Sequence, residues 1–160
     1  MGLSGLGGAQ RKHHTGSRIR GTSRETDEMF NKIHHIGIAV KDMDAAIALY
    51  VKMGAKLLAR ETNKDGSTDL AMLDLGGDLI EPISPLRDDT NLAKFIRERG
   101  EGLHHVAYDV KNIEGVIAQM KVQGFQMIDE KSRPGFGGHL VAFIQPKSTM
   151  GTLWELVEDI

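Results

Sequence analysis

The chain contains an internal repeat, and this repeat constrains its fold more than any other feature. Moving the sequence by 70 positions places Ile33–Leu58 on Leu103–Ile128 without a gap. Seven of the 26 aligned pairs are identical, and most of the others pair two apolar residues. The identical pairs include two neighbouring histidines, His34–His35 and His104–His105. Such self-similarity indicates a duplicated unit, so we expect two copies of one substructure.

Both units have the same predicted order of elements. A β-rich run, Ile33–Val40 or Leu103–Val110, precedes a helix-capping residue, Asp42 or Asn112. An amphipathic helix follows, with a glycine just past its end, where left-handed backbone favours glycine. Three short strands are expected next. They lie at about 55–61, 68–75 and 78–83 in the first unit, and at about 125–130, 139–145 and 152–158 in the second.

A third helix is expected between the units. Asp89 or Thr90 can cap the segment Asn91–Arg99, and Gly100 ends it. The predicted fold class is therefore α+β, built from two tandem βαβββ modules. Module 1 spans about 32–86, the connector helix about 90–99 and module 2 about 102–159, all within one domain, 31–160.

Residues 1–30 differ in composition and are expected to lie outside the core. Gly, Ser, Thr, Arg and Lys dominate the segment, which has too little apolar surface to offset the entropy of ordering it. It lacks the apolar stretch of a secretory signal, but residues 1–24 carry basic residues and no acid, as organellar presequences do. We expect a disordered extension of a cytoplasmic protein, or a mitochondrial-matrix protein if the segment is a presequence. His13 and His14 receive no role.

Composition excludes several classes of protein. The chain carries 20 Lys and Arg against 22 Asp and Glu, a net charge of −2, so we do not expect nucleic acid as a partner. Its apolar runs are much shorter than the roughly 20 residues of a membrane-spanning helix. Cysteine is absent, which excludes disulfides and thiolate metal sites. Any metal must therefore be bound by histidines and carboxylates.

One histidine of each pair is a candidate ligand. Side chains alternate between the two faces of a strand, so His35 and His105 fall on a face of small residues. His34 and His104 fall on the face of the large apolar residues. A single histidine on a strand is often only hydrogen-bonded and structural, but the repeat places two at equivalent positions.

The last predicted strand of each unit carries a glutamate in an apolar run, Glu81 or Glu155. Burying a carboxylate is costly unless it is paired or bound to a cation. Together with His35 and His105, the two glutamates could bind a divalent cation that keeps open positions for a substrate. The alternative is an edge strand whose glutamate faces solvent.

Three segments carry a resemblance to a known family: HHIGIAVKD (34–42), LAKFIRERGEGLHHVA (92–107) and RPGFGGHLVAFIQPKSTMGTLWELVE (133–158). They resemble the vicinal-oxygen-chelate superfamily and, within it, the methylmalonyl-CoA epimerase family, over Lys32 to about Glu158. Gln145 departs from the family pattern, which usually has His there. The resemblance implies that the two βαβββ modules form a cupped, barrel-like mixed sheet, as in glyoxalase-like folds.

The resemblance also implies a reaction and its ligands. The family's metal positions fall on His35, Glu81, His105 and Glu155, and the ion would be cobalt, zinc, manganese or nickel. The reaction interconverts (R)- and (S)-methylmalonyl-CoA: C2 loses its proton, a metal-stabilised thioester enolate forms, and a proton returns to the other face.

Inversion at C2 needs one base on each face. The resemblance makes Glu155 one base and places the second at Asp69, with Asp65 and Asp109 as further candidates. Asp69 is one methylene shorter than the Glu of some relatives, and it could instead be a polar strand residue that faces solvent.

The remaining implications concern binding partners. Arg133, Lys147 and Ser148 are candidates for contacts to the coenzyme A thioester, although this region could also be a plain surface hairpin. The family implies a homodimer. Two other functions stay open: a glyoxalase I-type lactoylglutathione lyase, which would use the same four ligands, and a non-catalytic small-molecule-binding protein of the same fold. A structural protein without a site would leave the paired His and Glu unexplained.

Overall fold

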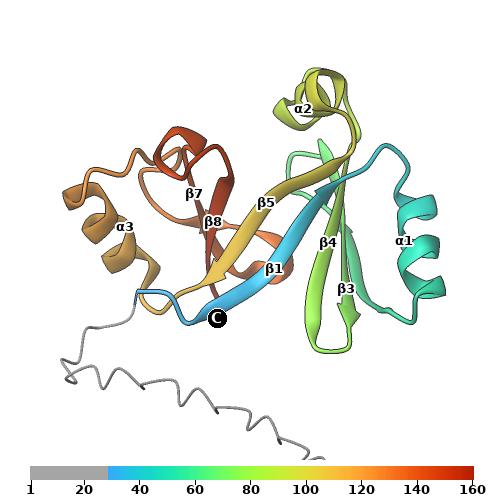
Figure 1. Ribbon diagram of the computed structural model, residues 1–160, viewed down its shortest axis with the longest axis horizontal. Coiled ribbons are helices and arrows are strands. Elements are labelled where there is room, and N and C mark those ends of the chain that lie inside the picture. The colour runs from blue at the N-terminus through green and yellow to red at the C-terminus, as the bar shows by residue number, and fades with distance from the viewer. Residues whose placement is uncertain (1–28) are drawn as a thin grey trace, which may run out of the picture.

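The computed structural model describes residues 29–160, and its strands form one curved sheet (Figure 1). The strand order is β2-β3-β4-β1-β5-β8-β7-β6. The strands are β1 (Lys32–Ala39), β2 (Lys56–Thr62), β3 (Thr68–Leu75), β4 (Asp78–Pro85), β5 (Gly102–Asp109), β6 (Arg133–Pro134), β7 (Leu140–Ile144) and β8 (Leu153–Glu158). The curvature makes a cup that is open on one side.

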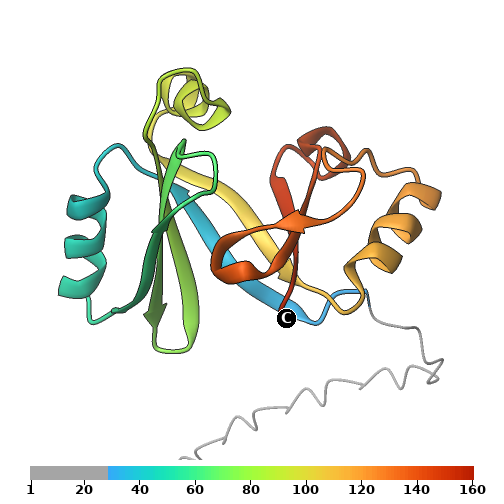
Figure 2. The same ribbon diagram turned by 180° about the vertical axis from the view of Figure 1, so that it is seen from behind.

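Within residues 29–160, three helices lie around the sheet: α1 (Met43–Lys52), α2 (Asn91–Arg99) and α3 (Ile113–Val122). Figures 1 and 2 place α1 and α3 on the outer flanks of the two halves. Two short 3-10 turns, η1 (Phe136–Gly138) and η2 (Pro146–Ser148), belong to the second half. The predicted caps form, because Asp42 accepts a hydrogen bond from the Ala45 N–H and Asn112 accepts one from the Gly115 N–H. None of the helices within 29–160 is long and apolar enough to cross a membrane.

The topology repeats as the sequence does. The first strand of each module, β1 or β5, runs parallel to the last strand of the same module, β4 or β8. The two first strands then pair with each other in antiparallel orientation at the centre of the sheet. The predicted α+β fold, with two βαβββ modules in a cupped mixed sheet, is confirmed.

Each half has its own apolar core between its helix and its part of the sheet. Met29 and Phe30 pack against the core under α3, and the Phe30 ring lies 5.3 Å from that of Tyr108. These two residues were expected in the extension but belong to the folded part, whereas His13, His14 and the rest of 1–28 lie outside the described residues. The central residues of the α3 core are Val110, Ile113, Ile117, Met120, Ile144 and Leu156.

The strand expected at 125–130 does not form. Only an isolated bridge between Met127 and Ile144 is present there, and the edge strand of this half is the two-residue β6. A side chain explains the interruption, because the Asp129 carboxylate accepts the hydrogen bond of the Phe143 N–H at 2.9 Å. The Phe143 N–H thus binds a side chain instead of a backbone carbonyl of a neighbouring strand, and strand pairing with β7 stops there.

The α3 core gives a first testable expectation. Met120 is completely buried, whereas Val122, two residues along the same helix, is 89% exposed. Met120→Ala leaves a cavity and should lower the free energy of unfolding by about 2–5 kcal/mol. Val122→Ala, the matched control, should change it by less than about 0.5 kcal/mol. Urea denaturation followed by circular dichroism measures both, and equal effects would contradict the assignment of this core.

Candidate metal centre

The register of the central strands brings a glutamate of module 1 beside a histidine of module 2. Glu81 on β4 pairs with Gly37 on β1, and Gly37 pairs in turn with His105 on β5. The His105 ring lies directly over Gly37, since a Cβ added to that glycine would meet the ring at 2.0 Å. The absence of a side chain at position 37 is thus what lets the imidazole reach toward Glu81.

The same arrangement occurs a second time across the central strands, with the two modules exchanged. His35 on β1 pairs with Ala107 on β5, and Ala107 pairs with Glu155 on β8. A small residue again separates the histidine from the glutamate, so that the imidazole of one module approaches the carboxylate of the other. In each of these two sets of paired residues, a histidine of one module approaches a glutamate of the other. Together the sets place two imidazoles and two carboxylates on the same face of the sheet.

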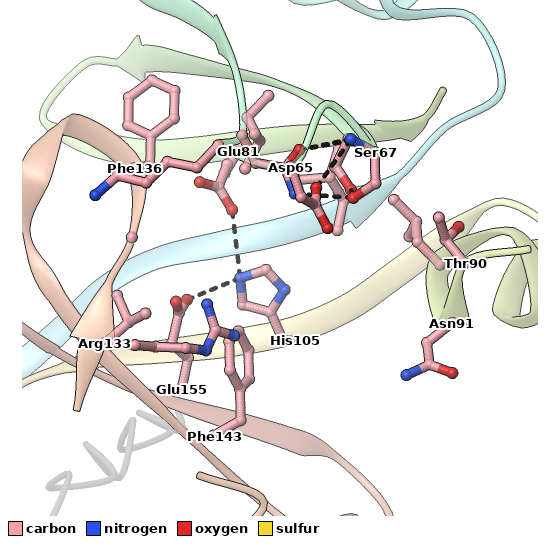
Figure 3. A pocket seen from close by; sticks show the side chains of 18 of the residues that line it. Asp65, Ser67, Glu81, Thr90, Asn91, His105, Arg133, Phe136, Phe143 and Glu155 are labelled. Carbon is pink, nitrogen blue, oxygen red and sulfur yellow. Dashed lines mark hydrogen bonds and ion pairs between the residues drawn. The ribbon is translucent and has the colours of Figure 1, made fainter. Parts of the chain in front are cut away.

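The four side chains meet at hydrogen-bond distances in the base of the cup. The Nε2 atoms of His35 and His105 lie 3.1 Å apart, and each lies 3.1 Å from Glu155 Oε2. Glu81 Oε2 lies 3.4 Å from the first nitrogen and 3.5 Å from the second. Figure 3 shows Glu81 and Glu155 approaching His105 from opposite sides. All four residues are between 2% and 6% exposed. The four predicted residues therefore converge. Their role as metal ligands stays a prediction.

The donor set fits a divalent cation. Two ligand atoms that each lie about 2.0–2.1 Å from one ion, at a right angle, are about 3 Å apart, close to the observed separations. Glu155 Oε2 is buried and has no hydrogen-bond partner of suitable geometry within 29–160, although two ring nitrogens lie close to it. A buried carboxylate oxygen without a hydrogen bond, beside two imidazole nitrogens, suits a shared cation.

Without a cation, charge compensation within the cluster sets the protonation states. Burial opposes a charged imidazole, but the nearby carboxylates of Glu155 and Glu81 outweigh it and raise the pKa of His35 to about 10 and that of His105 to about 9. Burial likewise disfavours the two carboxylates, and the two imidazoles outweigh it and lower the pKa of Glu81 and Glu155. The cluster then holds two positive and two negative charges, so a bound cation has to displace the imidazole Nε2 protons.

His34 and His104 do not lie where strict alternation predicts. The β1–β5 ladder is irregular next to both residues, so that each is an extra residue in its strand. Such bulges re-aim a side chain. The His34 ring turns toward its neighbour, with the two Nδ1 atoms 2.8 Å apart, and His104 does the same at 2.9 Å. Burial lowers the pKa of His34 and lowers that of His104 to about 4, which favours the neutral form of each ring.

A cavity of about 970 Å³ opens above the four residues. Glu81, His105 and Glu155 are part of its wall, and Arg133 points into it with its guanidinium 5.3 Å from the Phe143 ring centroid (Figure 3). A cavity of this size can hold the acyl end of a ligand and leave its remainder at the open side.

Asp69 is held away from this cavity. Its β3 neighbours Thr68 and Leu70 line the cavity, so Asp69 belongs to the opposite face of the strand. Arg60 donates hydrogen bonds to its carboxylate, the shortest at 2.7 Å, and also binds Asp44. The structure therefore does not bring Asp69 together with the four converging residues. The motif match that suggested Asp69 did not take into account on which face of β3 its side chain lies.

The other candidate residues divide into two groups. Asp65 lines the cavity, and hydrogen bonds from Ser67 lower its pKa. Asp109 instead accepts a hydrogen bond from Asn31, 3.3 Å long, at the far end of β5. Ser148 accepts a hydrogen bond from the Gln126 N–H, and Lys147 is exposed beside it, neither of them in the cavity wall.

Glu61 is an acidic residue of the cavity wall that was not predicted. Glu61 on β2 lines the cavity, and its Oε1 accepts a hydrogen bond from the Gly137 N–H of the glycine-rich turn, 3.1 Å long. This contact joins the first module to the loop of the second. The sequence offers no signal for it, because β2 is exposed along its whole length and has no apolar alternation.

Comparison with known families supports a shared architecture. A family model described as the Glyoxalase/Bleomycin resistance protein/Dioxygenase superfamily matches residues 34–143. Among curated relatives, the "Uncharacterized protein YqjC" of Bacillus subtilis (strain 168) is 34% identical over 129 residues, which cover 80% of this chain and 92% of the relative. An "Ethylmalonyl-CoA/methylmalonyl-CoA epimerase" of Cereibacter sphaeroides is 30% identical over 132 residues, 80% of this chain and 98% of the relative.

Solved structures give the same fold. The crystal structure of methylmalonyl-CoA epimerase from Mycobacterium tuberculosis has a TM-score of 0.79 at 32% identity and covers 82% of this chain and 90% of its own. A methylmalonyl-CoA epimerase in complex with methylmalonyl-CoA and NH4+ has a TM-score of 0.77 at 29% identity and covers 81% of this chain and 95% of its own. The curled sheet with its three helices is the fold of these enzymes.

The close approach over Gly37 predicts a selective defect in metal binding. In Gly37→Ala, the added methyl group would displace the His105 ring, so we expect Co²⁺ to bind about 10- to 100-fold more weakly in calorimetric titration. Ala107→Gly changes the equivalent position of the other module without adding an atom and should leave the affinity unchanged. Equal affinities for Gly37→Ala and the parent chain would contradict this packing.

The raised histidine pKa values predict how the metal-free protein responds to pH. An unfolded histidine has a pKa of about 6.5, against about 9 to 10 for His105 and His35 in the folded chain. Between these values the folded state keeps protons that the unfolded state has lost, so the free energy of unfolding falls as pH rises. The stabilisation is fully present below about pH 6.5 and lost by about pH 10.

Thermal melts of the metal-free protein across this pH range measure the effect. The melting temperature should fall steadily with rising pH, and the slope should be smaller in His35→Gln, which has one such group fewer. A melting temperature that rises over the same range would show that the charge assignment is incorrect.

Proposed function

The chain belongs to the Glyoxalase/Bleomycin resistance protein/Dioxygenase superfamily, and we propose that within it the chain is a divalent-metal-dependent epimerase of methylmalonyl-CoA. One observation carries the proposal: the two modules each contribute one imidazole and one carboxylate to a single buried cluster at the base of a cavity. One relative described above is named an ethylmalonyl-CoA/methylmalonyl-CoA epimerase, and a solved structure with the same fold is a methylmalonyl-CoA epimerase. Epimerase chemistry therefore fits both the cluster and the cavity.

The substrate supplies an acidic proton for this chemistry. C2 of methylmalonyl-CoA lies between a carboxylate and a thioester, so the negative charge left by deprotonation spreads onto the thioester oxygen. A divalent cation held by His35, Glu81, His105 and Glu155 would supply positive charge to these oxygens. The chain itself contributes the fixed geometry of the four ligands at the base of the cavity.

Glu155 is proposed as the first base, as the family resemblance implies. Its carboxylate comes from β8 and lies at the base of the cavity, and its Oε2 accepts no hydrogen bond from any residue in 29–160. A carboxylate in this position can take the C2 proton from the face of the substrate turned toward the cluster. The proton must then be returned to the opposite face by a second group.

Glu61 is proposed as that second group. Asp69 occupies the position implied by the resemblance, but its carboxylate is bound by Arg60 and it would have to leave this partner and turn through the strand to reach the substrate. Glu61 already belongs to the cavity wall, on the edge of the cup farthest along the sheet from β8. A substrate between β2 and β8 would thus have one carboxylate on either side.

The remaining parts of the proposal concern coenzyme A and assembly. Arg133 lines the cavity and is proposed to bind a phosphate or carboxylate of the thioester there. Lys147 and Ser148 lie outside the cavity wall and would contact the outer part of coenzyme A. The ion is proposed to be cobalt, zinc, manganese or nickel, which suit imidazole and carboxylate ligands, and the functional unit is proposed to be a homodimer.

Hydrogen exchange at C2 tests the function directly. In D₂O with Co²⁺, the protein should incorporate deuterium at C2 of methylmalonyl-CoA, detected by mass spectrometry or proton NMR. Removal of the ion with a chelator should abolish exchange, and added Co²⁺ should restore it. If exchange is absent and the hemithioacetal of methylglyoxal and glutathione is converted instead, the protein is a glyoxalase I-type lyase.

Variants in the same assay separate the two candidate bases. Glu61→Gln should lower kcat by about 10²- to 10⁴-fold while metal content stays unchanged. Asp69→Asn should behave like Asp44→Asn, its matched control, because both residues bind the same Arg60. A large loss in Asp69→Asn with normal activity in the other two variants would return the role to Asp69.

A further inference from the structure

Each of the two histidines among the proposed metal ligands, His35 and His105, follows a second histidine whose ring faces it. His34 and His104 are the bulged residues of β1 and β5, and their Nδ1 atoms lie 2.8 and 2.9 Å from the Nδ1 atoms of His35 and His105. A regular strand would put neighbouring side chains on opposite faces. The same irregularity occurs at the same place in both modules, so the doubled histidine acts as one structural unit.

Contacts of His34 determine the direction of its hydrogen bonds. Its Nε2 lies 3.1 Å from Asp159 Oδ1, and an ionised carboxylate only accepts hydrogen bonds. The Nε2 of His34 therefore carries the hydrogen that is donated to Asp159, and His34 Nδ1 is the atom placed to accept from His35. His35 then donates its Nδ1–H to that atom, and once a cation displaces its other ring hydrogen, the free lone pair of His35 is on Nε2, the atom that faces Glu81 and Glu155.

We propose that His34 and His104 are positioning residues that hold His35 and His105 in the tautomer with hydrogen on Nδ1 and the metal-binding lone pair on Nε2. This inference rests on the proposed metal site. Metal-bound histidines in proteins usually donate their other N–H to a carboxylate or carbonyl acceptor. Here a second imidazole serves as the acceptor. In module 1 that imidazole, His34, in turn donates a hydrogen bond to Asp159.

A competing arrangement uses the same atoms differently. His34, His139 and Asp159 also form a cluster in which Asp159 Oδ1 lies 3.1 Å from His34 Nε2 and 3.2 Å from His139 Nδ1. A cation bound there would take the Nε2 lone pair of His34 and move the ring hydrogen to Nδ1. His34 would then donate to His35, whose Nε2 would carry a hydrogen and could not bind a cation. The two arrangements exclude each other, so the stoichiometry and the tautomers distinguish them.

Binding of Co²⁺ to variants of the full chain is the first test. His34→Phe and His104→Phe remove the acceptor and should each weaken Co²⁺ binding about 10- to 100-fold in calorimetric titration, with a changed visible spectrum of the bound ion. His34→Asn and His104→Asn place an amide oxygen near the former Nδ1 and should recover most of the affinity. His139→Phe, which removes a neighbour of Asp159 but not of His35, is the matched control and should bind Co²⁺ as the parent chain does.

Histidine tautomers can be observed without any substitution. In the Zn²⁺-loaded protein with ¹⁵N-labelled histidine, two-bond ¹H–¹⁵N correlation spectra should show hydrogen on Nδ1 for His35 and His105, and on Nε2 for His34 and His104. This measurement decides the inference even if a phenylalanine variant fails to fold, which a thermal melt would detect.

The outcomes separate this inference from the proposed function. A parent chain that binds no Co²⁺ and exchanges no deuterium at C2 overturns both. A parent chain that binds one Co²⁺ and is active, but whose folded phenylalanine variants bind the ion equally well, overturns only the positioning role. Hydrogen on Nδ1 of His34, or two Co²⁺ ions per chain, would also overturn it.

Discussion

The antiparallel pairing of β1 with β5 is the constraint on which the rest of the structure depends. It joins the two halves of the sheet and aligns Gly37 with His105 and His35 with Ala107. Because side chains alternate with a period of two, a shift of one residue in this register would turn the imidazoles to the other face. The two small residues are equally necessary, since each imidazole extends across the one that separates it from a carboxylate. The central pair of strands thus fixes fold and site together.

Burial of four ionisable side chains would be costly if their charges were not balanced. In the metal-free protein, two protonated imidazoles compensate two carboxylates at separations of 3.1 to 3.5 Å. A cation would replace the two protons and leave the net charge of the cluster and its ion unchanged. The same geometry therefore serves both states, and the surrounding apolar cores do not need to rearrange between them. The contribution of this cluster to the free energy of unfolding depends on pH, whereas the contribution of the apolar cores under α1 and α3 does not.

Much of this arrangement could be predicted from the sequence, because it follows from local periodicity and from duplication. The repeat identified the modules, the capping residues Asp42 and Asn112, and the four side chains that converge. The remaining features depend on tertiary context. Alternation along a regular strand cannot predict the bulges at His34 and His104, and a motif match cannot tell on which face of β3 Asp69 lies. Likewise, Asp129 ends a ladder through a side-chain contact that only the folded chain brings together.

The pseudo-twofold relation between the modules has a consequence for how such a site can diverge. An isologous pair of identical half-length chains would complete the same four-sided cluster, but every substitution in it would then occur twice. Fusion into one polypeptide removes this restriction, so each half can specialise on its own. This chain already departs from symmetry: Gly37 corresponds to Ala107, and His34 reaches a carboxylate while the His104 ring packs against Phe95. Such inequality allows the two sides of a bound molecule to meet different chemistry, which no exact twofold site could offer to an asymmetric substrate.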